Sequence, residues 1–441
     1  MTEDAPSAKA PISRRRALEV GGTLGIGGLV GALAASRLGD DPSSSSPSPS
    51  PSQSHSPDGA PPAGSQSFVN VKDYGAVGDG VSDDTAAIND AIDAAVLQEL
   101  DGRSQAILFP AGLYRTRGQH VLRNRCLLVG HGKGASTIQA LDDASGDMFR
   151  FVAPFSGIRD LHLQGGQKSG DGAVFDAGNP ILESAQITDF GGNGVTVGKS
   201  ERAIGGTYHN IKIKDCRGYG VWIGDKTGST DGMWTNFDIG RSGKSAFYIG
   251  AGAQLLVNVH VWGSGLYDAR DNHGFYLNAT QNCLTNCESE KNNGNGIFVA
   301  EKADANRVLG GMIWANVQAG ILAVSSSYLQ ISTAVYDNGI GSTDDDQGEY
   351  SAIALDGVTH SLITGCFMYD RGESFEGGAS GDNPYPGKPP RKCQTYAVHA
   401  TNGSDKNIIT GNVMDSGDLR VSGQPLLTVG AADVISGNVT G

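Results

Sequence analysis

The chain has 441 residues and a formal net charge of -14, because 47 Asp and Glu outnumber 33 Lys and Arg. The basic residues form no stripe of the kind that a phosphate backbone requires, which argues against nucleic acid as a partner. The cysteine spacing is typical of neither a small disulfide-bonded scaffold nor a zinc site, so we predict free, buried thiols. The six cysteines are Cys126, Cys216, Cys283, Cys287, Cys366 and Cys393.

The first 40 residues have the pattern of an export signal. Ser13-Arg14-Arg15-Arg16 precedes an apolar, Gly-rich stretch from Val20 to Ala35, which contains a small-residue cleavage site at Ala32-Leu33-Ala34. This arrangement resembles a twin-arginine signal and predicts a secreted or cell-surface protein, with the signal either cleaved or retained as an anchor. Residues 41–67 are rich in Ser and Pro and are expected to form a disordered linker. We predict a single domain over residues 68–441.

The predicted domain opens with FVNVKDYGAVGDGVSDDTAAINDAIDAA, followed shortly by AILFPAGLYRT. Asp83 or Asp84 can cap a helix near 84–97, in which Ile88, Ile92 and Val96 form one apolar face. Such a helix would cover the open end of a solenoid core.

From residue 210 the chain repeats a unit made of a short alternating strand, a turn rich in Gly and Asn, and a second alternating strand. Equivalent positions follow one another at spacings of 26, 22, 28 and 24 residues, which is typical of solenoids. The alternation with period two and the density of Gly and Asn exclude a helical repeat. The repeats therefore predict an all-β solenoid of about ten coils. The equivalent positions are Asn210, Asn236, Asn258, Asn286 and Gly310.

These segments resemble the pectate-lyase-like superfamily, which includes rhamnogalacturonase- and epimerase-type proteins. The opening segment carries the resemblance, and the repeats agree with it. The resemblance implies a right-handed parallel β-helix. It also implies a secreted carbohydrate-active enzyme, such as a polysaccharide hydrolase, lyase or epimerase, or a phage depolymerase.

Two outward surfaces of the predicted solenoid compete for the active site. On the first, Asp238 and Glu288 would lie two coils, or about 10 Å, apart, with His260 between them and Glu290 beside them. This separation is close to that of an inverting carboxylate pair. A solvated sheet face or an oligomer contact explains the same pattern. One column of this surface is Lys212, Asp238, His260, Glu288 and Met312, and the next is Lys214, Gly240, Trp262, Glu290, Trp314, Tyr336 and Tyr369.

The second surface carries an exposed aromatic ladder. Aromatic faces suit stacking on sugar rings, but the same stripe would also suit a homotrimer interface. The turns that precede these strands are enlarged at 263–273, 339–350 and 371–395, so we expect them to wall a cleft. The ladder consists of Trp222, Tyr248, Tyr276 and Phe298.

The sequence GLYDARDNHGFYLN lies at the entrance of that cleft. Pectin-type hydrolases carry an aspartate and a His at a similar place, and alginate epimerases carry Tyr, Asp and His, but neither full motif is present. The alternative interpretation is a turn whose residues only cap a strand.

We hypothesise that Asp271 and Asp268 act as acid and base, and that His273 shuttles a proton or orients the substrate. Arg270 would hold a substrate carboxylate in a bidentate grip, and Tyr267 would contact the sugar. Together with the aromatic ladder, these residues form the first candidate site.

The leading functional hypothesis is a secreted glycoside hydrolase that cleaves a polysaccharide or oligosaccharide with paired carboxylates. The alternatives are a polysaccharide lyase, an epimerase, an intramolecular glycosyl transferase and a non-catalytic, trimeric glycan-binding β-helix. No cofactor is expected. Residues 344–346 are three aspartates that could hold Ca²⁺, but they lack the alternating ligand pattern.

Overall fold

The computed structural model describes residues 68–97, 105–266, 272–342, 350–374, 387–415, 426–427 and 430–440. The expected signal and linker lie outside these ranges, so both stay predictions. Among the described residues, no helix has the length and apolar character needed to cross a membrane.

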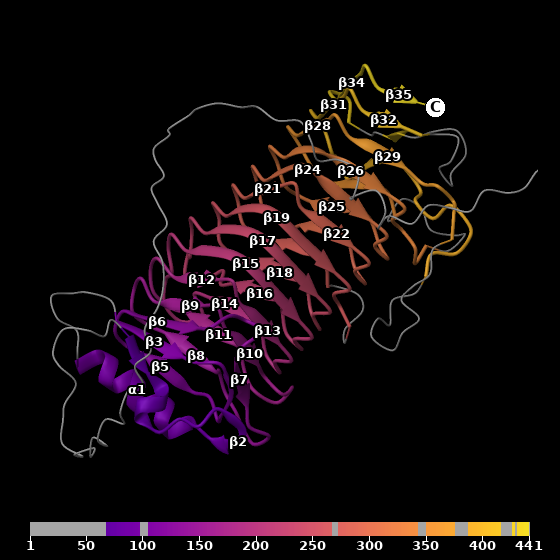
Figure 1. Ribbon diagram of the computed structural model, residues 1–441. Coiled ribbons are helices and arrows are strands. Elements are labelled where there is room, and N and C mark those ends of the chain that lie inside the picture. The colour runs from indigo at the N-terminus through magenta and orange to yellow at the C-terminus, as the bar shows by residue number, and fades with distance from the viewer. Residues whose placement is uncertain are drawn as a thin grey trace, which may run out of the picture. The chain divides into compact units, whose positions relative to one another are not determined.

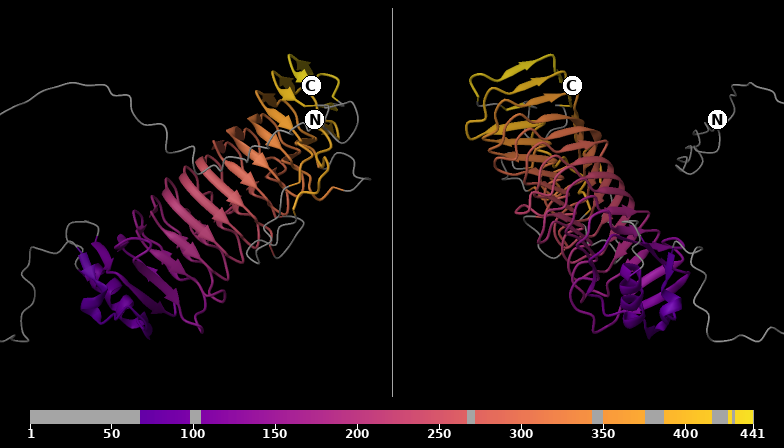
Figure 2. Two further views of the ribbon diagram at one scale, coloured as in Figure 1. Left: turned by 45° about the vertical axis from the view of Figure 1, so that its right-hand side comes forward. Right: turned by 90° about the vertical axis from the view of Figure 1, so that its left-hand side faces the viewer.

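The described chain is a right-handed parallel β-helix, as predicted (Figures 1 and 2). Each coil has three faces. The first and second faces belong to one sheet of 23 strands, and the third face is a sheet of 12 strands. Twelve stacked strands correspond to about eleven turns, one more than the sequence predicts.

The chain bends between the first and second faces at residues with positive φ. The φ angle is 57° at Asn210, 58° at Asn236 and 68° at Gly310. Asn and Gly adopt this left-handed conformation most readily, which explains their recurrence in the repeat. Asn258 donates to Asn236 (3.2 Å), and Asn286 donates to Asn258 (2.7 Å), so side chains also connect the coils along this corner.

The strands of the large sheet divide between the first two faces. The first face contains β1 (Phe68–Asn70), β3 (Gln105–Phe109), β6 (Cys126–Gly130), β9 (Gly157–Arg159), β12 (Ile181–Glu183), β21 (Cys283–Thr285), β28 (Leu362–Thr364), β31 (Ile408–Thr410) and β34 (Val434–Ser436). The second contains β2 (Asp79–Asp83), β4 (Gly112–Thr116), β7 (Ser136–Ala140), β10 (His162–Gln164), β13 (Gln186–Thr188), β22 (Glu288–Glu290), β29 (Phe367–Tyr369), β32 (Val413–Met414) and β35 (Val439–Thr440). Five long strands cover both faces: β15 (Thr207–Lys214), β17 (Met233–Gly240), β19 (Leu255–Trp262), β24 (Arg307–Trp314) and β26 (Gln330–Tyr336).

The third face is formed by short strands that stack in chain order. They are β5 (His120–Leu122), β8 (Phe149–Phe151), β11 (Ala173–Phe175), β14 (Val195–Val197), β16 (Val221–Ile223), β18 (Phe247–Ile249), β20 (Phe275–Leu277), β23 (Ile297–Val299), β25 (Ile321–Val324), β27 (Ile353–Asp356), β30 (Val398–Thr401) and β33 (Leu426–Leu427).

Inward side chains of neighbouring coils stack into columns that fill the core. The register places Ile211 beside Phe237, and Phe237 beside Val259, as the repeat predicts. Phe247 and Phe275 stack in the same way on the third face. All five are at most 2% exposed, and burying one such side chain contributes roughly 1.5–3 kcal/mol. Many equivalent contacts, rather than a few strong ones, therefore hold the coils together.

The helix α1 (Thr85–Leu97) closes the first end of this core, as predicted. It follows a single 3-10 turn, η2 (Val71–Tyr74). The helix packs on η2, β1 and β3. Its buried residues are Ala87, Ile88, Ala91, Ile92 and Ala95.

The two aspartates before α1 have different roles. The Asp84 carboxylate accepts hydrogen bonds from the backbone amides of Val77 (2.7 Å) and Gly78 (3.3 Å). It therefore fixes the preceding turn. Asp83 is the residue whose carboxylate accepts from the Thr85 amide (3.1 Å) at the start of the helix.

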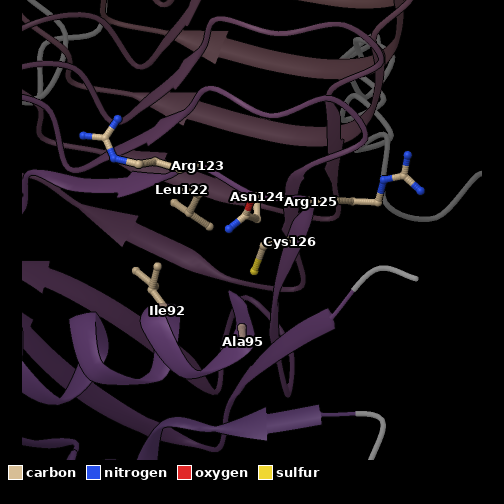
Figure 3. Close-up of a pocket in the computed structure, with 7 residues that line it drawn as sticks. All are labelled: Ile92, Ala95, Leu122, Arg123, Asn124, Arg125 and Cys126. Atoms are coloured by element: carbon tan, nitrogen blue, oxygen red, sulfur yellow. The ribbon is translucent and has the colours of Figure 1, made fainter. Parts of the chain in front are cut away.

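Figure 3 shows a small cavity between α1 and the turn from β5 to β6, lined by Ile92 and residues 122–126 among others. Its volume of about 10 Å³ has room for about one water molecule. Cys126 points toward α1, whereas Arg123 and Arg125 point away. The cavity is a packing gap under the cap and is too small for a sugar.

All six cysteines are free, as predicted, and all but the half-buried Cys283 are buried. Burial raises the pKa of Cys126, Cys216 and Cys287 to about 12. These thiols therefore stay protonated and serve as core residues.

Candidate functional site

Three enlarged turns lie at the corner between the second and third faces. In three coils the connection is lengthened to 263–274, 337–352 and 370–397. The central part of each enlarged turn lies outside the described residues, so the predicted cleft walls stay a prediction. In five other coils the connection has only six residues: 189–194, 215–220, 241–246, 291–296 and 315–320.

The bases of the two longest turns are joined by buried polar contacts. Lys388 Nζ lies 3.0 Å from Asp370 Oδ1, and both side chains are completely buried. Asp370 Oδ2 accepts from the amides of Cys393 (2.7 Å) and Gln394 (2.9 Å). The Ser342 hydroxyl, in the neighbouring enlarged turn, donates to the Cys393 carbonyl (3.0 Å). Contacts within the 370–397 turn, and one contact between the two turns, therefore order the described ends of both turns.

The predicted aromatic column is present on the third face. Trp222, Tyr248, Tyr276 and Phe298 pair in register. Their consecutive ring centroids lie 6.3, 5.0 and 4.9 Å apart. The prediction that the ladder is exposed is wrong, because Tyr248 is only 9% exposed and the other three rings are half-buried. Neighbouring rings cover Tyr248, including Tyr219 from the preceding turn at 5.2 Å.

Phenol groups gather around this column beside a cation. Burial raises the pKa of Tyr248 to about 12, although Asn278 Nδ2 donates to its oxygen (2.8 Å) and opposes the shift. Burial also raises the pKa of Tyr219, and the neighbouring Tyr276 raises it further. Lys244 Nζ lies 5.1 Å from the centroid of the Tyr219 ring. At neutral pH Tyr219 and Tyr248 are therefore protonated donors near a positive charge.

His273 lies at the edge of the aromatic column, beside Phe298 (centroids 4.7 Å apart) and Tyr276 (5.5 Å). It is 5% exposed. Burial lowers its pKa to about 3, so the ring is neutral at physiological pH. Its Nδ1 accepts from the Asn295 amide (3.1 Å), which leaves the proton on Nε2. His273 can therefore act as a neutral hydrogen-bond donor.

His273 is also one member of a polar ladder that the sequence analysis missed. Its own amide donates to Ser245 Oγ (2.9 Å), in the same way that the Tyr219 amide donates to Asn193 Oδ1 (2.8 Å). Each of these residues stands two positions before a third-face strand, so the repeat itself was the signal that could have revealed the ladder. The ladder has two hydrogen-bonded runs, one through Asp147, Asp171, Asn193 and Tyr219 and the other through Ser245, His273 and Asn295.

The polar ladder bears on the alternative interpretation, in which residues 265–278 form a turn that only caps a strand. His273 does accept the amide of the next coil, so it has a structural role whatever else it does. Tyr267, Asp268, Arg270 and Asp271 lie outside the described residues, and their predicted roles stay hypotheses.

The residues of the competing candidate site lie together on the second face, as predicted. They are Asp238, His260, Glu288 and Glu290. The register places Asp238 beside His260 and His260 beside Glu288. His260 Nε2 lies 3.3 Å from Glu290 Oε1, and its Nδ1 lies 3.8 Å from Asp238 Oδ1. Burial by itself would lower the pKa of His260, but hydrogen bonding to Glu290 and the nearby carboxylates raise it above its usual value.

These carboxylates differ from the pair that an inverting hydrolase requires. Trp262 Nε1 donates to Asp238 Oδ1 (2.8 Å), and Trp314 Nε1 donates to Glu288 Oε1 (3.0 Å). Burial by itself would raise the pKa of Glu290, but His260 and Lys291 lower it below its usual value. The lowered pKa favours the ionised form of Glu290, whereas a catalytic acid must keep its proton. Glu290 is therefore unsuited to act as the acid of such a pair.

The parallel stacking of the coils defines a β-helix protein of the pectate-lyase-like type. The family described as "Rhamnogalacturonase A/epimerase, pectate lyase-like" matches residues 68–321, and the chain belongs to this family.

Similar proteins include mannuronan C5-epimerases from Azotobacter vinelandii. AlgE5 is 33% identical over an alignment of 165 residues, and the match covers 34% of this chain and 15% of AlgE5. Alginate lyase 7 from the same organism is 33% identical over an alignment of 119 residues, and the match covers 24% of this chain and 13% of that protein. This chain therefore spans only a small part of the length of these relatives.

Two solved structures share the fold. The A-module of mannuronan C-5 epimerase AlgE6 from Azotobacter vinelandii has a TM-score of 0.58 at 20% identity, covering 84% of this chain and 99% of the module. DFA-IIIase from Arthrobacter chlorophenolicus A6 has a TM-score of 0.60 at 13% identity, with the same two coverages. At these identities the likeness concerns the fold alone.

Proposed function

We propose that this protein modifies a uronate-containing polysaccharide by removing a proton next to the sugar carboxylate, as an epimerase or a lyase. The observation that carries the proposal is the third-face cluster of protonated phenols, a neutral imidazole and Lys244. The named activities of the similar epimerases and of the similar alginate lyase support it. The hydrolase that the sequence analysis favoured has no such support from the similar proteins.

Epimerisation and elimination begin with the same step. A base removes the proton from the carbon beside the carboxylate, and negative charge spreads onto the carboxylate oxygens. Return of a proton to the opposite side of the ring inverts that carbon, whereas loss of the neighbouring glycosidic oxygen breaks the chain. Both routes need a base, donors for the developing charge and a proton donor.

The third-face groups match these needs. Lys244 and the neutral Nε2–H of His273 are suited to the substrate carboxylate, because both can only donate. Tyr276 is half-buried beside His273 and is suited to deliver a proton. Asp271, hypothesised from the sequence as an acid or base, completes the proposal as the base.

The proposal is tested by incubating the purified chain in heavy water with mannuronan, polygalacturonate and a neutral glycan. An epimerase incorporates deuterium at the inverted carbon without new reducing ends. A lyase produces unsaturated ends that absorb ultraviolet light. Reducing ends without deuterium or unsaturation would instead establish a hydrolase and overturn the proposal.

We further propose export through the predicted twin-arginine signal. Fusion of residues 1–67 to a reporter should direct it across the membrane, and replacing Arg14, Arg15 and Arg16 by Lys should abolish export. A reporter that stays inside the cell with the unaltered segment would refute this.

A further inference from the structure

The second-face cluster suggests a role separate from glycan chemistry. His260 lies on β19, and Glu288 and Glu290 lie on β22, in the adjacent coil. One ligand atom from each of the three residues can be chosen so that all lie within 4.8 Å of one another. All three side chains are half-buried, so the cluster is reachable from solvent but partly shielded from it.

The spacing of the closest pair matches metal coordination. His260 Nε2 and Glu290 Oε1 are 3.3 Å apart. Two ligands that each lie about 2.0–2.2 Å from a tetrahedral zinc ion are separated by about 3.3–3.6 Å. The distance between these two atoms therefore already equals the edge length of a coordination tetrahedron, and a carboxylate oxygen of Glu288 lies within 4.8 Å of a ligand atom of each of the other two residues.

Groups outside the cluster hold the ligands in suitable orientations. Asp238 lies on the Nδ1 side of His260, at 3.8 Å, which leaves Nε2 directed toward the glutamates. This carboxylate–histidine arrangement is the usual support of a metal-binding imidazole. Trp314 donates to one oxygen of Glu288 (3.0 Å), so the other oxygen remains for a cation.

The cluster carries more carboxylates than the lysines paired with it. Glu290 Oε2 is buried, and its partner is the ammonium group of Lys291, whose Nζ lies 3.2 Å away. The only other lysine in an ion pair with these carboxylates, among the residues described, is Lys212, at 3.5 Å from Asp238. Three carboxylates therefore stand against two lysines around the His260 ring.

We infer that His260, Glu288 and Glu290 form a binding site for a divalent transition-metal ion, with Zn²⁺ as the best match. One imidazole and two carboxylates suit Zn²⁺, whereas Ca²⁺ and Mg²⁺ prefer oxygen ligands alone. Three protein ligands leave a fourth position for water or an external ligand. The site does not depend on the proposed glycan activity, since none of its ligands belongs to the third-face cluster.

The test uses untagged, chelator-treated full-length protein and Zn²⁺ alone. Titration calorimetry and metal analysis after dialysis should give one Zn²⁺ per chain, and Co²⁺ should produce the visible absorption of a tetrahedral site. His260→Ala and Glu290→Gln should each remove stoichiometric binding. Asp238→Asn keeps all three ligands, so it should weaken binding by about 10–100-fold without changing the stoichiometry.

His209→Ala provides the matched control. His209 is a half-buried histidine on the first face of β15, where it contacts Thr235 Oγ1 (2.8 Å). This variant should bind Zn²⁺ like the original protein. Equal binding by the original protein and by His260→Ala, or no stoichiometric binding by the original protein, would overturn the inference. Thermal transitions without metal verify that each variant folds, and Glu288→Gln replaces any variant that does not.

Discussion

Burial of neutral histidines should make the stability of this protein depend on pH, and His273 should contribute a measurable part of that dependence. The pKa of His273 is lowered to about 3 in the folded chain, whereas an unfolded histidine titrates near 6.5. Between these values the unfolded state binds more protons, so stability is fully present above about pH 6.5 and falls as the pH drops toward 3. At pH 5, protonation of the unfolded chain at this one residue costs about 2 kcal/mol, since 1.5 pH units correspond to about 1.4 kcal/mol each.

His273→Asn isolates this effect. Asn193 and Asn295 occupy equivalent positions of the polar ladder, so asparagine can supply the acceptor without titrating. Urea unfolding at pH 8 and pH 5 should show that the variant loses about 2 kcal/mol less than the original protein on acidification. Asn278→Ala, a non-titrating change in the same cluster, should leave the pH dependence unaltered. An unchanged pH dependence in His273→Asn would refute the reasoning.

Three further predictions concern the site and its support. Once a substrate is identified, Tyr276→Phe should lower turnover by about 10²–10⁴-fold because a proton donor is lost. Tyr336→Phe, on the second face, should leave the rate unchanged, and equal rates for both variants would exclude Tyr276. Asp271→Asn should fold normally and react at least about a hundredfold more slowly than the unmodified protein. Activity close to that of the unmodified protein would show that residues 265–278 form only a turn. Lys388→Met should lower the unfolding free energy by about 3–5 kcal/mol, because it leaves the Asp370 charge buried without its partner, and a loss well below 1 kcal/mol in urea unfolding would contradict this.

The solenoid and its columns could be predicted from the sequence because in-register stacking depends only on local repetition. Asn or Gly marks each bend, and alternation assigns each side chain to the inside or the outside. Once the coils align, residues at equivalent positions must become neighbours. The column through Asp238, His260 and Glu288 and the aromatic column through Tyr248 and Tyr276 therefore followed without any knowledge of long-range contacts.

Burial and hydrogen bonding were decided only by the tertiary structure. Alternation predicted that Tyr248 points outward, but Tyr219 from a turn and the neighbouring rings cover it. Likewise, the indole groups of Trp262 and Trp314 reach diagonally to a carboxylate of the preceding coil, and this contact depends on side-chain rotation. A repeat specifies which backbone positions are adjacent, whereas the surroundings of each polar atom depend on turn paths and side-chain rotamers that no local pattern encodes. The sequence by itself therefore determined the scaffold and its columns, and the tertiary structure decided which of their groups keep a proton, accept one or face a cation.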